Sequence, residues 1–220
     1  MNVTFEAVKQ SQEIQTYITQ ADASLLALGY TEHSFAHVGR RAKVAGDLLR
    51  DLGYDEKTVE LCRIAAYMHD IGNVVNRNDH AQTGAVMAFR ILDKMGMEPA
   101  DVAAVITAIG HHDDPTAFPV NAIAAALLLA DKTDVRRSRV RNRDTINFDI
   151  HDRVNYAVEK ARTTMSEDKK SIILSLTIDT SISAVMDYFE IFLTRMMLCR
   201  KAAEKLGVRF ALSINGQAML

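Results

Sequence analysis

The sequence predicts a mainly α-helical protein with a small strand-helix-strand unit at its C-terminal end. Long stretches place apolar residues three and four positions apart, and the 220 residues include only three prolines, a pattern typical of helices. Two segments near the C-terminus instead alternate apolar and polar residues, as half-buried strands do. The length suits one substantial core with an appendage. We therefore expect a helical body over residues 1–165 and an appendage over 166–220.

Glycine and proline divide the predicted body into helices. We expect helices at residues 5–28, 34–52, 57–70, 80–96, 100–112, 120–132 and 149–165. The breaks between them fall at Gly29, Gly53, Gly72, Gly96 and Pro115. Glycine just after the last helical turn, or proline in the following loop, is a common stop signal.

The appendage is predicted from two alternating segments. Residues 171–179 and 208–214 each alternate apolar with mostly polar side chains, and residues 181–206 between them are apolar at helical spacing. A connection of this length favours two parallel strands joined by a crossover helix. Two strands alone form a marginal sheet. The unit must therefore pack on the helical body or pair with another subunit, and a homodimer formed through it is one hypothesis.

Composition argues against a membrane or nucleic-acid partner. The N-terminal residues lack a basic start and a long apolar core, and the most apolar stretch, 120–130, is too short to span a bilayer. The net charge is −2, which disfavours a broad surface for nucleic acid. Cys62 and Cys199 lie in helical patterns and are expected to be buried, reduced thiols. We expect a cytoplasmic protein.

The segment 136–143 is locally basic. It contains five arginines, namely Arg136, Arg137, Arg139, Arg141 and Arg143. Such a patch on an otherwise acidic chain could hold a phosphorylated ligand. A solvated or salt-bridged segment is an equally good interpretation.

Histidines and aspartates at helix ends are the candidates for chemistry. Six of the seven histidines group as His33 with His37, His69 with His80, and His111 with His112. Asp70 closes the apolar segment LCRIAAYMHD, and Asp131 follows the apolar run 122–130. A carboxylate at a helix C-terminus meets the negative end of the dipole, and burying it is costly without a partner. A divalent cation could be that partner, and so could Lys132 or a nearby arginine.

The possible ligands outnumber the needs of one ion. Imidazoles and carboxylates without thiolates suit Fe, Mn, Co, Ni or Zn, with Mg also possible. An aspartate can bridge two ions about 3.5–4 Å apart, so five histidines and two aspartates would make a two-metal site if all are ligands. His33 and His37 are four residues apart and share a helix face, and their spacing alone does not choose between them. His80 could instead be a helix cap, and His151 is interpreted as structural.

Five sequence pieces in order resemble the HD superfamily of metal-dependent phosphohydrolases. They are EHSFAHVGRR (32–41), AAYMHDIGN (65–73), HAQTG (80–84), GHHDD (110–114) and LLLADKTD (127–134), and the match covers about residues 30–135. The resemblance implies an HD-domain helical bundle. It also implies that one ion is held by His37, His69, Asp70 and Asp131, and a second by His80, His111 and His112 with Asp70 bridging.

The extra histidines look like the binuclear branch that includes the HD-GYP phosphodiesterases. Two departures separate the chain from that subgroup. Asn73 stands where the subgroup has a lysine, and no Gly-Tyr-Pro segment follows His111 and His112. Hydrolysis of cyclic di-GMP is therefore not favoured.

The resulting hypothesis is a phosphohydrolase with two metal ions, Fe or Mn first, that cleaves a phosphate ester or anhydride of a nucleotide or related small molecule. A metal-bridging hydroxide would attack phosphorus, with Asp70 as the bridging ligand. Arg40 or Arg41, and Arg136 or Arg137, could hold phosphate. His33 could protonate the leaving oxygen. Asp113 is a candidate for orienting a metal ligand or for acid/base catalysis. A diiron oxygenase and a non-catalytic nucleotide sensor are the alternative functions.

Overall fold

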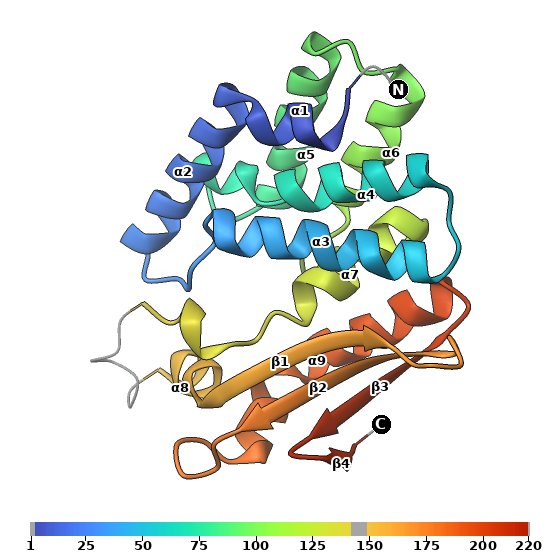
Figure 1. The fold of residues 1–220 in the computed structure, drawn as a ribbon. Coiled ribbons are helices and arrows are strands. Elements are labelled where there is room, and N and C mark those ends of the chain that lie inside the picture. Colours follow the sequence, from blue (N-terminus) through green and yellow to red (C-terminus); the bar gives the residue numbers. More distant parts are fainter. Residues whose placement is uncertain (1–2, 142–148, 220) are drawn as a thin grey trace.

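The computed structural model describes residues 3–141 and 149–219. Its helical body consists of α1 (Phe5–Gln10), α2 (Gln12–Ala27), α3 (Phe35–Asp51), α4 (Glu56–Met68), α5 (His80–Lys94), α6 (Pro99–Gly110) and α7 (Ala122–Lys132), with a short 3-10 helix η1 (Ile71–Val74) after α4. Figure 1 shows this body above the C-terminal sheet, with α7 between the two. The mainly helical fold class is confirmed.

The helix predictions hold over most of the body. One exception is the single helix expected over 5–28, which is interrupted at Ser11. Ser11 has extended backbone angles, and its hydroxyl accepts a hydrogen bond from the backbone N–H of Ile14. A serine N-cap satisfies one of the free N–H groups at a helix start, so the chain begins a new helix there.

Gly72 brings η1 against the first turn of α5. A Cβ atom at this position would overlap the carbonyl oxygen of His80 and come within 2.5 Å of the backbone nitrogen of Gly84. Only glycine permits so close an approach. The contact holds Asp70, two residues earlier, beside the start of α5, where His80 lies.

The C-terminal unit contains a four-stranded sheet. It begins with α8 (Ile150–Ala157) and continues through β1 (Val158–Met165), β2 (Ser171–Ile178), α9 (Val185–Lys205), β3 (Arg209–Ile214) and β4 (Gln217–Ala218). The strand order is β1-β2-β3-β4. The pair β2–β3 is parallel and α9 crosses between them, as predicted, whereas β1–β2 and β3–β4 are antiparallel.

The helix predicted over 149–165 is wrong in its second half. Helix α8 ends at Ala157, and Val158–Met165 form strand β1. This strand pairs with β2 along nearly its whole length, so non-local backbone hydrogen bonds outweigh the weak local preference of the segment VEKARTTM. The predicted strand-helix-strand unit is present as β2, α9 and β3, and the sheet has β1 and β4 in addition.

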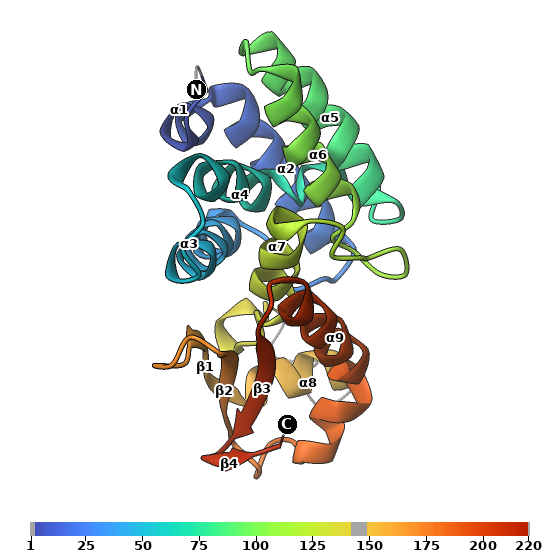
Figure 2. The same ribbon diagram turned by 90° about the vertical axis from the view of Figure 1, so that its right-hand side faces the viewer.

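The unit packs directly on the helical body. Helix α9 covers one face of the sheet and also contacts α7 (Figure 2). The Thr163 hydroxyl of β1 donates to the Thr133 hydroxyl at the end of α7 over 2.9 Å. Packing on the body is therefore confirmed, while the homodimer stays a prediction.

Two smaller expectations can be compared with the structure. Cys62 and Cys199 are buried and free, as predicted. Within residues 3–141 and 149–219, no helix combines the length and the apolar character needed to cross a membrane.

Candidate metal centre

The candidate centre lies where five helices of the body present histidine or aspartate. His37 lies in the first turn of α3, His69 and Asp70 directly follow α4, and His80 is the first residue of α5. His112 follows α6, and Asp131 lies in the last turn of α7. Helix ends and starts from distant parts of the sequence thus converge on one place.

Four of these side chains direct one atom each toward a common point. His37 Nε2 is 3.6 Å from Asp70 Oδ2 and 3.4 Å from Asp131 Oδ1. His69 Nε2 is 3.1 Å from Asp70 Oδ2 and 3.6 Å from Asp131 Oδ1. We refer to these four residues as the first ligand group.

The first ligand group fits a metal ion because its buried atoms have no hydrogen-bond partners. Among the described residues, the unpaired buried atoms include His37 Nε2, His69 Nε2 and Asp70 Oδ2. Leaving a buried donor or acceptor unpaired costs about 1–3 kcal/mol each. A single cation at their common point would pair with all three, and nitrogen and carboxylate oxygen ligands suit Fe, Mn or Zn.

A second group lies on the other side of Asp70. Its Oδ1 atom is 3.5 Å from His80 Nε2 and 3.9 Å from His112 Nε2, and the two Nε2 atoms are 3.2 Å apart. Together, Asp70, His80 and His112 form the second ligand group. Asp70 therefore turns one carboxylate oxygen to each group, which is the arrangement of a bridging ligand.

Hydrogen bonds of Nδ1, on the ring edge away from the site, fix the orientation of the four histidine rings. In each ring Nδ1 lies within hydrogen-bond distance of an oxygen that can only accept, so Nδ1 carries a hydrogen and Nε2 is the nitrogen turned toward the site. The pairs are His37 with Asp134 Oδ2 (2.7 Å), His69 with the Ala66 carbonyl (2.9 Å), His80 with the Arg77 carbonyl (2.9 Å) and His112 with the Ile109 carbonyl (2.6 Å).

The site is electrostatically suited to a cation. Burial by itself raises the pKa of Asp70 and Asp131, but His69 and Lys132 are the leading opposing charges and hold both pKa values well below the usual range. Burial lowers the pKa of His112 to about 3. For His69, burial also lowers the pKa, yet the Asp70 and Asp131 carboxylates outweigh it and raise the pKa to about 10. A bound metal ion would have to displace that proton.

Asp134 supports the first ligand group and was not predicted. It is buried and accepts from His37, while Arg41 (3.3 Å) and Arg136 (2.8 Å) lie against the same carboxylate. Burial raises the pKa of Asp134, but the hydrogen bond from His37 and the charges of Arg139 and Arg41 hold that pKa well below its usual range. Its position three residues after Asp131 is the only signal in the sequence.

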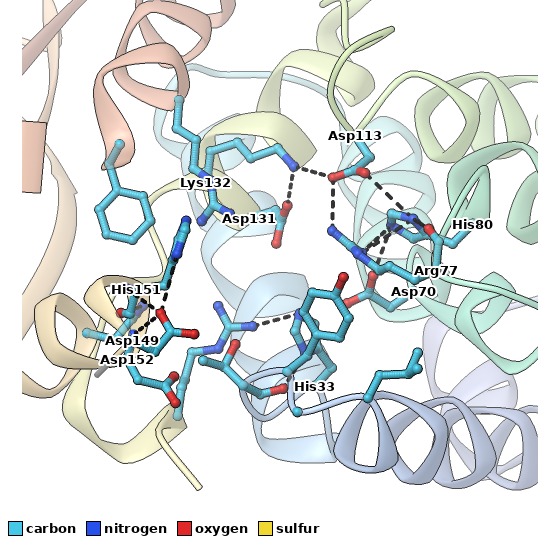
Figure 3. A pocket seen from close by; sticks show the side chains of 18 of the residues that line it. His33, Asp70, Arg77, His80, Asp113, Asp131, Lys132, Asp149, His151 and Asp152 are labelled. Atoms are coloured by element: carbon cyan, nitrogen blue, oxygen red, sulfur yellow. Dashed lines mark hydrogen bonds and ion pairs between the residues drawn. The ribbon is translucent and has the colours of Figure 1, made fainter. Parts of the chain in front are cut away.

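A cavity of about 330 Å³ lies beside both ligand groups. Figure 3 shows Asp70 and His80 on one side of it, with Lys132 and Asp131 above. Its cationic residues are Arg77, Lys132, Arg139 and Arg195. Asp113 accepts a hydrogen bond from Lys132 at 3.0 Å and lies 3.6 Å from Arg77, so it holds two of these cations in place.

The structure brings some of the predicted residues to this cavity and not others. His33 lines it, with Nε2 2.9 Å from Arg139 Nη2. Arg40 is exposed on α3 and does not line it. Arg136 is held by Asp134 and by Glu32 at 3.4 Å, also outside the lining.

His111 is also apart from the ligand groups. Its Nδ1 donates to the Thr107 carbonyl over 2.9 Å, and among the described residues it belongs to no cluster of possible metal ligands.

The basic segment 136–143 is mostly engaged in structural contacts where it is described. Arg137 donates to the Tyr156 carbonyl at 2.6 Å, and Arg141 pairs with Asp22. Arg139 is the member of the segment that reaches the cavity. Arg143 lies outside the described residues.

Comparison with protein families gives one match. The family model described as the HD domain matches residues 34–136. All six residues of the two ligand groups fall within this range, whereas α8, α9 and the sheet lie beyond it. A comparison with curated proteins finds no match to the chain.

Proposed function

We propose that the protein, whose residues 34–136 match the HD domain, is a phosphohydrolase that uses two metal ions to cleave a phosphate ester or anhydride of a small molecule such as a nucleotide. One observation carries the proposal. Asp70 turns its two oxygens toward two separate groups of buried ligand atoms, and both groups border a cavity lined by cations.

The first ligand group would hold one ion and the second ligand group the other, with Asp70 shared. Ions bound there would activate water at neutral pH and withdraw charge from phosphate oxygens. Iron or manganese suits the mixture of imidazole and carboxylate ligands. The remaining steps depend on side chains of the chain itself.

Lys132 and Arg77 are placed to hold the phosphate oxygens. Both line the cavity, and Lys132 Nζ lies 3.0 Å from Asp131 Oδ2, so this ammonium group reaches the ligand shell. Asp113 forms an ion pair with each of these cations and restricts their positions. Stabilising charge on the transferred phosphoryl group by such fixed cations is a main part of phosphoryl-transfer catalysis.

His33 is better placed to position Arg139 than to donate a proton. Its Nδ1 donates to the Thr31 carbonyl over 2.7 Å, which leaves Nε2 to accept from Arg139 at 2.9 Å. Burial, followed by the charge of Arg139, holds the pKa of His33 well below its usual value. The ring is therefore neutral near pH 7, and Arg139 is held toward the cavity.

The test is phosphate release from a panel of nucleotides and other phosphate esters by protein loaded with manganese or iron. Asp70→Asn should lower turnover at least about 100-fold, because both ions lose a ligand. Asp47→Asn is the matched control, since Asp47 is an exposed aspartate of α3. Unchanged turnover in Asp70→Asn would contradict the proposal, as would the absence of phosphate release across the panel. Oxygen uptake by the iron-loaded protein in that case would indicate the oxygenase alternative.

A further inference from the structure

The C-terminal unit forms one wall of the cavity beside the ligand groups. Phe192 and Arg195 of α9, together with Asp152 and Asn155 of α8, line it. Figure 3 shows Asp149, His151 and Asp152 across the cavity from Asp70, Arg77 and His80. This wall lies outside the residues that match the HD domain.

Arg195 is an arginine on the inward face of α9. Phe192, Met196 and Cys199 of the same face are buried, and the Arg195 guanidinium lies 4.9 Å from the centroid of the Phe192 ring. A cation over an aromatic face is attracted to it and is restricted in orientation. The ring therefore holds the guanidinium at the edge of the cavity.

The surroundings of Arg195 differ from those of Arg41, Arg136 and Arg139. Arg41, Arg136 and Arg139 each lie within 4.0 Å of the Asp134 carboxylate. Within residues 3–141 and 149–219, no hydrogen bond or ion pair of the Arg195 guanidinium is present. A partly buried guanidinium without an anionic partner is costly, and a phosphate in the cavity would supply that partner.

Carboxylates of the cavity lining also act on the charge of Arg195. Burial lowers its pKa, whereas the carboxylates of Asp131 and Asp113 act on it in the opposite direction. Arg195, Asp131 and Asp113 all line the cavity, so the guanidinium faces the same space as these carboxylates. A phosphate in this cavity would have Arg195 on one wall and Asp70, His80, His112 and Asp131 on another.

We propose that Arg195 binds the phosphate of the substrate, so that the C-terminal unit completes the active site. This inference rests on the proposed phosphohydrolase function. A guanidinium can bind two phosphate oxygens at once. The volume of about 330 Å³ is at the lower end for small-molecule sites, so the substrate is a small phosphorylated molecule.

The part of this wall that α8 forms differs in charge from the part that Arg195 forms. Asp149, His151, Asp152 and Asn155 line the cavity there, and two of these four side chains are carboxylates. Carboxylates accept hydrogen bonds and repel anions. We therefore expect hydroxyl or amino groups, and not a second phosphate, on the part of the substrate that contacts α8.

The experiment measures binding of inorganic phosphate to manganese-loaded protein by isothermal titration calorimetry. Arg195→Ala should weaken binding about 10- to 100-fold, the usual effect of losing hydrogen bonds to a charged group. Arg195→Lys should fall between this variant and the wild type, because an ammonium group keeps the charge but not the paired geometry. Arg200→Ala is the matched control, since Arg200 is exposed on the same helix and pairs with Glu204; it should change binding less than twofold.

The outcomes separate this inference from the proposed function. Metal content is measured on the same samples, and Arg195→Lys provides the comparison if Arg195→Ala does not fold. Equal phosphate affinity in the wild type and the Arg195 variants would overturn the inference, as would a wild-type protein that binds no phosphate. If the wild type releases phosphate from a substrate whose KM is unchanged in Arg195→Lys and Arg195→Ala, the inference fails while the proposed function stands. Weaker phosphate binding in Arg195→Ala, without turnover of any substrate by the wild type, would support the anion site and contradict the hydrolase.

Discussion

Asp134→Asn should lower the free energy of unfolding and also weaken metal binding by the first ligand group. The Asp134 side chain is 2 % exposed. Its carboxylate lies 2.7 Å from His37 Nδ1, 2.8 Å from Arg136 Nε and 3.3 Å from Arg41 Nη2. Asparagine keeps the shape but removes the negative charge that balances the Arg41 and Arg136 guanidinium groups. Removing one partner of a buried ion pair costs about 3–5 kcal/mol, a large part of a typical stability of about 5–15 kcal/mol.

The assay is urea unfolding of the metal-free protein at pH 7, followed by circular dichroism. The control is Asp47→Asn, an exposed aspartate of α3 that pairs with Lys43 and Arg50, for which a loss below about 1 kcal/mol is expected. Because the folded pKa of Asp134 is depressed, its contribution is present above the unfolded pKa of about 3.9 and is lost as the pH falls further. The difference between wild type and Asp134→Asn should therefore shrink below about pH 4. A loss below 1 kcal/mol at pH 7 would refute the reasoning.

The remaining predictions concern the metal ligands and the thiols. His112→Ala should lower the metal content, whereas His111→Ala should leave it unchanged in elemental analysis, because only His112 lies in a ligand group; equal losses would show that His111 is also a ligand. Metal binding at pH 7.5 should release about one proton, since the pKa of His69 is raised to about 10 in the metal-free site; calorimetry in buffers of different ionisation enthalpy counts it, and no release would argue against this. The same raised pKa stabilises the metal-free protein below about pH 6.5, and this contribution should fade as the pH rises toward 10, which thermal unfolding across that range would reveal. Cys62 and Cys199 should react with a thiol reagent only on unfolding, because burial raises both pKa values; fast labelling of the native protein would contradict this.

The helical body and the two aspartates of the candidate site were accessible to prediction because their signals are local, whereas the choice among the histidines rested on the family resemblance. Apolar spacing and glycine stops locate most helices, and an aspartate at the end of an apolar helix identifies Asp70 and Asp131 as charges that need a partner. The structure brings His37, His69, His80 and His112 to these aspartates. It does not bring His111, because neighbouring residues at a helix end point in different directions.

The other features depend on contacts between distant segments. Strand β1 forms because β2 pairs with it, and no alternation in 158–165 indicates this. Arg40 is exposed and Arg41 is buried, a difference set by how α3 packs. Arg195 follows the matched domain by nearly 60 residues, and only the packing of α9 on α7 places it beside the cavity.

Metal stoichiometry tests the central claim most directly. The measurement is elemental analysis of purified protein after loading with manganese or iron, for the wild type, Asp70→Asn and the control Asp47→Asn. Two ions per chain are predicted in the wild type and the control, and fewer than one in Asp70→Asn, because Asp70 turns an oxygen to each ligand group. A wild-type chain that holds no metal, or an Asp70→Asn variant that still holds two ions, would contradict the account.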